Sequence, residues 1–311
     1  MTTAHDELLE SLRPAAFAIA YRMLGSVAEA EDVVQEALLR FHRALEEGQR
    51  IESPRAYVAT VATRLAIDEL RSARARRETY VGEWLPEPLL TDPADDPARH
   101  AEMADSLSMA FLVLLESLSP EQRAVLLLHD VFEYGYGEIA GIVDKSEANV
   151  RQLAVRARRH VDEGRPRFEA SREERDALAH RFFAAAQEGD LEGLEALLAE
   201  DVVLHGDGGG KAPALARAIH GARRVARTFG AWMRQGSRIA GLELREIEVN
   251  GQPGAMILDG EGKLLSVMTL DIADGRVQGI RSVVNPDKLR HIGPVADVAA
   301  LLRDRPAGRS G

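Results

Sequence analysis

The sequence has no cysteine, no long apolar run and no spacing typical of metal ligands, and each absence narrows the function. Without cysteine, the chain can form no disulfide, thiolate metal site or cysteine nucleophile, which fits a reducing cytosol. The longest apolar runs, such as residues 111–115 and 124–128, are far shorter than the roughly 20 residues of a membrane-spanning helix. The first ten residues are acidic rather than signal-like. We therefore expect a cytoplasmic protein with no membrane partner and no bound metal.

A nucleotide-binding loop is also missing. The glycine-rich stretch GDGGGKA lacks the required glycine spacing, and Ala212 follows the lysine where a magnesium-binding Ser or Thr would stand. A lone histidine beside a strand is more often a packed or surface residue than a catalytic base. We expect no catalytic residue and no cofactor, although a pocket enzyme would have four candidate lining residues, namely His205, Asp207, His220 and Asn285.

The charge of the chain is unevenly distributed. A net charge of -11 argues against nucleic acid, because binding phosphates requires positive surface. However, residues 81–118 hold eight acidic side chains against Arg99 alone. Arginines cluster on both sides of this segment, first Arg64, Arg71, Arg74, Arg76 and Arg77, then Arg151, Arg156, Arg158, Arg159, Arg165 and Arg167. Two cationic surfaces therefore flank an anionic connector.

The sequence pattern predicts a protein of several domains. Residues 8–77 have helical periodicity, and their two prolines, Pro14 and Pro54, fall near predicted helix starts. Residues 80–105 combine prolines with acids and have no apolar periodicity, which predicts a linker. Residues 107–161 are helical again, and an α+β pattern follows Pro166. We predict two all-α domains and a C-terminal α+β domain, with boundaries at 1–80, 81–106 (linker), 107–166, 170–292 and 293–311 (frayed tail).

The first helical domain presents two polar rows. One predicted helix packs through an apolar face that includes Phe41, whereas Asp32, Gln35 and Glu36 share the opposite face. A second helix opens at Ser53-Pro54 and carries Arg64, Asp68, Arg71 and Arg74 along one line, a row that can follow a phosphate backbone. Each row alone is usually a solvated surface.

The second helical domain predicts a helix-turn-helix. A capping box at Ser119 to Gln122 begins one helix. The helix-turn-helix follows it: a short helix, a turn at Asp144-Lys145, and a recognition helix that is capped by Ser146. Its outward positions near the start are suited to base edges, and arginines farther along are suited to phosphates. These positions are Ser146, Glu147, Ala148, Arg151 and Gln152 for bases, and Arg156, Arg158 and Arg159 for phosphates.

The C-terminal part predicts two helices within residues 176–201, broken at Gly189-Asp190, then a strand at 202–205 and a helix at 221–233. Hairpin turns are indicated at Asp259-Gly260 and Asp274-Gly275. The strand between them should place Leu265, Val267 and Thr269 on one face and Ser266, Met268 and Leu270 on the other.

Three segments of the first half together resemble regions two and four of the extracytoplasmic-function sigma factors: AEDVVQEALLRFHRAL, SPRAYVATVATRLAIDELRSARARRE and LSPEQRAVLLLHDVFEYGYGEIAGIVDKSEANVRQLAVRARR. The resemblance implies partners, namely core RNA polymerase, through its β′ clamp coiled coil and β flap, and promoter DNA. By resemblance, Asp32, Gln35, Glu36 and Phe41 lie on the helix that docks on the clamp, and Arg64, Asp68, Arg71 and Arg74 belong to the helix at the minus-ten element. The loop at 46–52 would hold an unstacked base, residues 146–159 would read the minus-thirty-five element, and the acidic linker would follow the positively charged channels of the polymerase.

Residues 170–290 resemble the SnoaL-like polyketide cyclase fold, a cone around an apolar pocket. Some sigma factors of this type carry such an extension, and the resemblance implies that it contacts the linker and both DNA-binding domains as a built-in regulator. Three elements look like its hallmarks: Trp84, Leu85 and Pro86 in the linker; Asp207, Gly208, Gly209, Gly210 and Lys211; and Asn285, Pro286, Asp287 and Lys288. A tryptophan followed by two prolines is a stiff apolar hook suited to docking, although it can also cover local core.

Two alternatives remain at this stage. The chain could be a DNA-targeted enzyme, which predicts turnover of small hydrophobic substrates. It could also be a helix-turn-helix regulator that senses a ligand, which predicts tight duplex binding without polymerase. An unidentified small ligand or protein partner of the C-terminal domain is left open.

Overall fold

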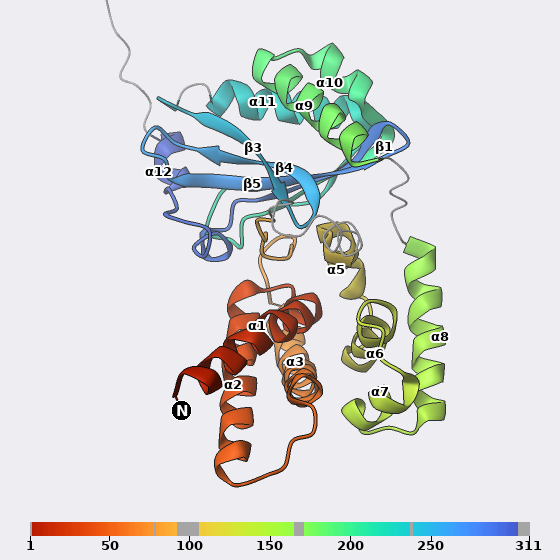
Figure 1. Ribbon diagram of the computed structural model, residues 1–311. Helices are drawn as coiled ribbons and strands as arrows, with labels where there is room; N and C mark the ends of the chain where they lie inside the picture. Colours follow the sequence, from red (N-terminus) through yellow and green to blue (C-terminus); the bar gives the residue numbers. More distant parts are fainter. Residues whose placement is uncertain (1, 78, 92–105, 165–170, 237–238, 304–311) are drawn as a thin grey trace, which may run out of the picture. The chain divides into compact units, whose positions relative to one another are not determined.

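The computed structural model describes residues 2–77, 79–91, 106–164, 171–236 and 239–303 (Figure 1). It divides into two compact units. Unit 1 consists of Met1–Thr79 and Phe111–Arg165, and unit 2 of Tyr80–Ala110 and Pro166–Gly311. The linker therefore groups with the C-terminal domain, and each unit is described by itself.

Unit 1 begins with three helices that pack against one another, α1 (Thr2–Leu24), α2 (Val27–Glu46) and α3 (Pro54–Arg77). The Ser26 hydroxyl caps α2 by accepting from the Glu29 amide at 3.2 Å. Pro14 lies inside α1, so the prediction that it marks a helix start is wrong. Proline removes one hydrogen bond from a helix, and the packing of this long helix against α2 and α3 compensates for that loss.

The second part of unit 1 contains α5 (Met109–Leu115, whose first two residues belong to unit 2), α6 (Pro120–Asp130), α7 (Tyr136–Val143) and α8 (Glu147–Gly164). The Ser119–Gln122 capping box is formed as predicted. Asp144 ends α7 in the left-handed region with φ 52°, and the Ser146 hydroxyl accepts from the Asn149 amide at 3.3 Å to start α8. Because Val150, Ala154, Ala157 and Val161 are buried, α8 packs through one face and leaves the other open.

Unit 2 holds a six-stranded sheet in the order β2-β1-β6-β5-β4-β3. Its strands are β1 (Leu198–Asp207), β2 (Ile219–His220), β3 (Glu243–Val249), β4 (Gln252–Leu258), β5 (Leu264–Ala273) and β6 (Arg276–Val283). All neighbours are antiparallel except β1 and β6, which are parallel. Helices α9 (Arg172–Glu188), α10 (Leu191–Leu197) and α11 (Ala222–Gly236) cover one face and form an apolar core with it (Figure 1).

Every residue of β5 is buried, so the strand is covered on both faces. The helices cover one face. Residues 80–91 and 106–110 lie against the other, where the Thr269 hydroxyl donates to the Met109 sulfur at 3.6 Å. The predicted alternation fails at Leu265, because a register shift between β4 and β5 places Leu265 in the helix-side core with Met268.

The C-terminal segment is packed rather than frayed from residue 293. Val295 forms a parallel bridge with Leu264, and the Leu264 amide donates to the Pro294 carbonyl at 2.8 Å. A short helix, α12 (Val298–Arg303), follows, and its Val298 and Leu301 pack against the apolar core. The prediction of a tail beginning at 293 is therefore wrong, because the apolar run after Gly293 pairs with the start of β5 and packs against the core. Residues 304–311 lie outside the described residues.

Candidate functional site

The polar face of α2 is open to solvent. Asp32 and Gln35 are exposed, and Glu36 accepts from Arg40 on the next turn at 2.7 Å. Leu39 extends the same row and is 41% exposed, a feature that the sequence analysis missed because Leu39 lies outside the apolar stripe. Phe41 is fully buried, with its ring 5.8 Å from that of Tyr57. It therefore supports α2 from inside and does not present a surface.

The described arginines of α3 are exposed, but Arg64 and Arg71 already form hydrogen bonds within unit 1. Arg64 donates to the carbonyls of Gly141 and Ile142 in α7 at 2.8 and 2.9 Å. Arg71 donates to Asp68 at 3.0 Å, and it also donates to Glu121 at 2.7 Å. The side chain of Arg74 lies outside the described residues.

Glu121 lies at the N-terminus of α6, where it receives the hydrogen bond from Arg71. Burial raises the pKa of Glu121, but the hydrogen bond and charge of Arg71 outweigh it, and the net shift is downward. This contact is therefore complete at neutral pH.

The open face of α8 carries polar and apolar groups. Ser146, Glu147, Gln152, Arg156 and Arg159 are exposed. Val155 is 65% exposed, so this face also presents an aliphatic group that was not predicted from the sequence.

Two arginines of α8 contact side chains of the same unit. Arg151 bonds Glu147 at 2.5 Å and lies 4.6 Å from the centre of the Tyr136 ring. Arg158 forms a bidentate ion pair with Asp130, and its guanidinium also donates to the Tyr136 hydroxyl. Arg158 is therefore a structural link between α8 and α6 in this conformation.

In unit 2, the three predicted hallmarks meet in one place. Asp207 at the end of β1 is fully buried and accepts four hydrogen bonds. Two come from the linker, from the Tyr80 hydroxyl at 2.5 Å and the Leu85 amide at 2.9 Å. The others come from the Gly209 amide at 3.0 Å and the Lys288 ammonium at 2.7 Å. A buried carboxylate with this many donors is compensated both electrostatically and by hydrogen bonds.

Lys288 completes the arrangement. Its ammonium also donates to the Leu85 carbonyl, and it lies 4.9 Å and 4.4 Å from the ring centres of Tyr80 and Trp84. The Asn285 amide donates to the Tyr80 hydroxyl at 2.8 Å. We call Asp207, Asn285 and Lys288 the linker anchor. Burial, the hydrogen bond to Asp207 and the charge of Asp207 all raise the pKa of Tyr80, so it stays a neutral donor.

The glycine-rich loop is shaped for close approach of the linker. A Cβ on Gly209 would lie 2.2 Å from the Asn285 amide nitrogen and 3.0 Å from the Tyr80 hydroxyl, and the residue has φ 57°. A Cβ on Gly210 would lie 3.1 Å from that of Val81. Only glycine fits both the backbone conformation and the space. Lys211 closes the loop through an ion pair with Asp287.

A second polar cluster lies next to the anchor. Glu83 of the linker contacts His205 at 2.9 Å. Burial lowers the pKa of His205, and the hydrogen bond to Glu83 offsets this only in part. Arg281 pairs with Asp271 beneath them, and burial lowers the pKa of Arg281 to about 10, although the charge of Glu83 opposes the shift.

The linker is held again where it passes β3. Asn250 is fully buried; its side chain accepts from the Leu89 amide at 2.9 Å and donates to the Leu107 carbonyl at 3.0 Å. It thus binds the chain on both sides of residues 92–105, which lie outside the described residues. Asn250 and Gly251 form the β3–β4 hairpin turn with φ 54° and 69°. The Asn-Gly pair is a strong hairpin signal in the sequence, although no turn was predicted at this position.

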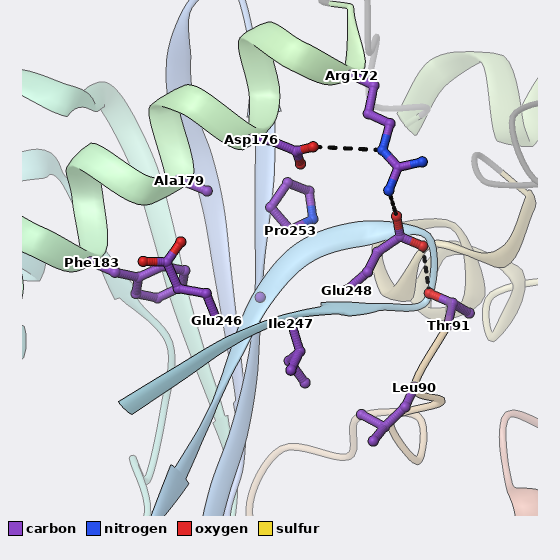
Figure 2. A pocket seen from close by; sticks show the side chains of 11 residues that line it. Leu90, Thr91, Arg172, Asp176, Ala179, Phe183, Glu246, Ile247, Glu248 and Pro253 are labelled. Atoms are coloured by element: carbon purple, nitrogen blue, oxygen red, sulfur yellow. Dashed lines mark hydrogen bonds and ion pairs between the residues drawn. The ribbon is translucent and has the colours of Figure 1, made fainter. Parts of the chain in front are cut away.

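A polar groove of about 590 Å³ lies beside this contact (Figure 2). Arg172 of α9 bridges Asp176 at 3.5 Å and Glu248 at 3.0 Å, and Glu248 also accepts from the Thr91 hydroxyl at 2.6 Å. Arg172, Asp176 and Glu248 are paired within the groove, and Glu246 pairs with His180 outside its lining. The groove therefore borders the linker contact at Thr91.

An apolar cavity of about 260 Å³ lies on the helix-covered face of the sheet. None of the four candidate pocket residues lines it. His205 and Asp207 bond the linker, as does Asn285, and His220 is exposed in β2. Among the described residues, no group of acidic and histidine side chains has the arrangement of a metal site. None of the helices in that part of the chain could cross a membrane.

Comparison with known proteins identifies each part. Residues 8–76 match the family model of sigma-70 region 2, residues 108–161 match sigma-70 region 4, and residues 179–285 match the SnoaL-like domain. These matches define the class, a two-region sigma factor fused to a SnoaL-like domain.

Individual relatives place the chain more narrowly. It is 39% identical to the ECF RNA polymerase sigma factor SigJ of Mycobacterium tuberculosis over 90% of this chain and 91% of the relative. It is 31% identical to the probable ECF sigma factor SigI of the same organism, over 87% and 90%. The crystal structure of M. tuberculosis SigJ matches with a TM-score of 0.74 and 34% identity, covering 92% of this chain and 98% of that one. The chain belongs to the extracytoplasmic-function sigma factors, and its function is promoter-directed initiation of transcription.

Proposed function

We propose that this sigma factor is restrained by its own C-terminal domain, which holds the linker at the linker anchor until the factor engages core RNA polymerase. The observation that carries the proposal is the buried Asp207, whose four donors include the side chain of Tyr80 and the backbone of Leu85. In an initiating complex the linker has to leave this position if it is to follow the channels of the polymerase. The linker cannot lie at the linker anchor and in the polymerase channels at the same time.

The polymerase-binding surface in this proposal is the exposed row of α2. Asp32, Gln35 and Glu36 would meet the clamp coiled coil of the β′ subunit, and Leu39 would add an apolar contact at the end of the row. Phe41 would support the helix from inside. The helix-turn-helix domain would in turn reach the β flap.

The promoter-binding surfaces are the exposed faces of α3 and α8. Arg64, Asp68 and Arg71 would face the minus-ten element, with Arg74 one turn farther along, and the loop at 46–52 would hold an unstacked base. Arg151 and Gln152 would read base edges of the minus-thirty-five element, next to Ser146 and Glu147, while Arg156 and Arg159 would contact phosphates.

The occupied arginines of α3 support the idea of a restrained free state. Arg64 and Arg71 donate to groups of α6 and α7, and the same donors cannot serve promoter phosphates at the same time. Promoter binding would therefore require α3 to part from α6 and α7. Polymerase would provide that separation by binding the two helical regions at a fixed distance.

We further propose that the C-terminal domain is not catalytic. In support, the described walls of its apolar cavity contain no acid, histidine or lysine that could act as general acid or base.

The test is reconstitution with core polymerase, followed by run-off transcription and mapping of start sites. We expect the full chain to form a stable assembly and the variant Tyr80→Phe, which loosens the linker anchor, to give several times more product. Failure to assemble with core polymerase would end the proposal that the factor acts through it. Equal output from Tyr80→Phe and wild type would remove the regulatory part alone.

A further inference from the structure

The first helix of the helix-turn-helix carries an aromatic side chain that contacts the second. Tyr136 is the first residue of α7, and the Gly135 amide, which donates to Glu138 at 2.8 Å, fixes this helix start. The Tyr136 side chain is half-buried, and the guanidinium carbon of Arg151 on α8 lies 4.6 Å from the centre of its ring. A cation over an aromatic ring is attracted by the negative face of the ring. Tyr136 therefore restrains a residue of α8 without belonging to that helix.

The Tyr136 ring is itself supported by α6. The centre of the His129 ring lies 4.1 Å from its centre. The Tyr136 hydroxyl accepts from Arg158 at 3.4 Å, a long hydrogen bond. Because the bidentate pair with Asp130 already holds Arg158 in place, this bond adds little. The ring, rather than the hydroxyl, is therefore the functional part of Tyr136.

Arg151 is restrained but keeps donors for a base. Its side chain is 59% exposed, and within the described part of the chain Glu147 accepts from one of its five N–H groups, at 2.5 Å. The Tyr136 ring contacts the face of the guanidinium, whereas the N–H groups lie in its plane. An unrestrained arginine loses rotamer freedom when it binds a base. Here the ring limits that freedom before the base arrives, and the remaining donors can meet the acceptor atoms of a guanine.

We infer that Tyr136 is a positioning residue for promoter selection: its ring holds Arg151 in the orientation that reads one guanine of the minus-thirty-five element. The inference rests on the proposed function, which assigns Arg151 to base edges. A tyrosine that only stabilised the helix-turn-helix would affect binding to every promoter alike. A positioning tyrosine instead changes the preference at the one base pair that Arg151 reads.

The test measures the preference for each base of the minus-thirty-five element, with the full chain assembled on core RNA polymerase and a library of promoters randomised in that element. Arg151→Ala first identifies the base pair that Arg151 reads. We expect Tyr136→Leu to reduce the preference at that pair about two- to fivefold, the value of an exposed cation–π contact, and to leave the other pairs unchanged. Tyr136→Phe, which keeps the ring, should retain the wild-type preference. The matched control is Tyr134→Leu, the same change at another half-buried tyrosine, which should not alter the preference at that pair.

A series of rings of nearly equal size separates the attraction between ring and cation from packing. It consists of Tyr136→Phe and its counterparts with one, two or three fluorine atoms on the ring. Each fluorine draws electron density from the ring and so weakens the attraction of its face for a cation. We expect the preference at the base pair read by Arg151 to fall stepwise along the series, while the melting temperature stays close to that of Tyr136→Phe. This series replaces Tyr136→Leu if that variant does not fold.

Three outcomes would overturn the inference. The first is an unchanged preference along the fluorinated series, and the second is an equal loss at every base pair, which indicates a structural role. The third is an Arg151→Ala variant with every preference unchanged, because the assignment of Arg151 in the proposed function then fails as well. A flat series at Tyr136 beside a responsive Arg151 refutes the positioning role alone.

Discussion

Loss of one hydroxyl should loosen the linker measurably. The Tyr80 hydroxyl donates to the buried Asp207 carboxylate at 2.5 Å and accepts from Asn285 at 2.8 Å. Hydrogen bonds to a charged group contribute about 1.5–3 kcal/mol. Tyr80→Phe keeps the ring over Lys288 and removes only this oxygen, so we expect local opening of the linker to become roughly 10- to 100-fold more frequent.

Amide hydrogen exchange measures this opening directly. The Leu85 amide donates to Asp207 at 2.9 Å and exchanges only when the linker leaves the anchor. We expect faster exchange at Leu85 in Tyr80→Phe and unchanged exchange in the core strand β5. The matched control is Tyr134→Phe, which makes the same change at a half-buried tyrosine of unit 1. If Leu85 exchanges at the wild-type rate in the Tyr80 variant, the anchor does not depend on this hydroxyl and the reasoning fails.

Three further outcomes are expected. Arg71→Ala should reduce promoter opening by roughly tenfold with little change in polymerase affinity, checked by permanganate footprinting and by competition for core enzyme; a loss of affinity instead would contradict the assignment to DNA. Gln152→Ala should relax selection at one base pair by about 1–3 kcal/mol, measured on a library of minus-thirty-five sequences; an unchanged preference at every position would count against its role. Burial lowers the pKa of His205, so the folded state favours the neutral imidazole. The contribution of neutral His205 to the free energy of unfolding is therefore complete above the unfolded pKa of about 6.5, and it is lost as the pH falls through the lower pKa of the folded state. Melting temperatures between pH 5 and 7.5 should fall more steeply for wild type than for His205→Gln, and parallel curves would refute this.

The helical half was predictable because its signals are local. The Ser119–Gln122 capping box, the turn at Asp144 and the buried stripe of α8 depend on neighbours within a few residues, and the structure has all three. Pro14 was misjudged because packing against other helices overrides the local preference of proline.

The contacts of the linker could not be derived from local patterns. Asp207 meets Tyr80 across 127 positions of the chain, and Asn250 meets Leu89 across 161. The hallmark motifs were found by resemblance, but Tyr80 and Asn250 belong to none of them. The exposed Leu39 and Val155 were not predicted, because both lie outside the apolar stripes of their helices and a periodicity argument assigns no role to such positions.

The burial of β5 on both faces has a practical consequence. Thr269, Asp271 and Arg281 belong to the face against which residues 80–91 and 106–110 lie, so a fragment beginning at residue 170 would expose a broad, partly apolar surface to water. We expect such a fragment to aggregate alone and to become soluble when a peptide of residues 80–110 is co-expressed with it. Such complementation would show that the C-terminal domain is completed by a stretch of chain from which unit 1 residues 111–165 separate it in the sequence.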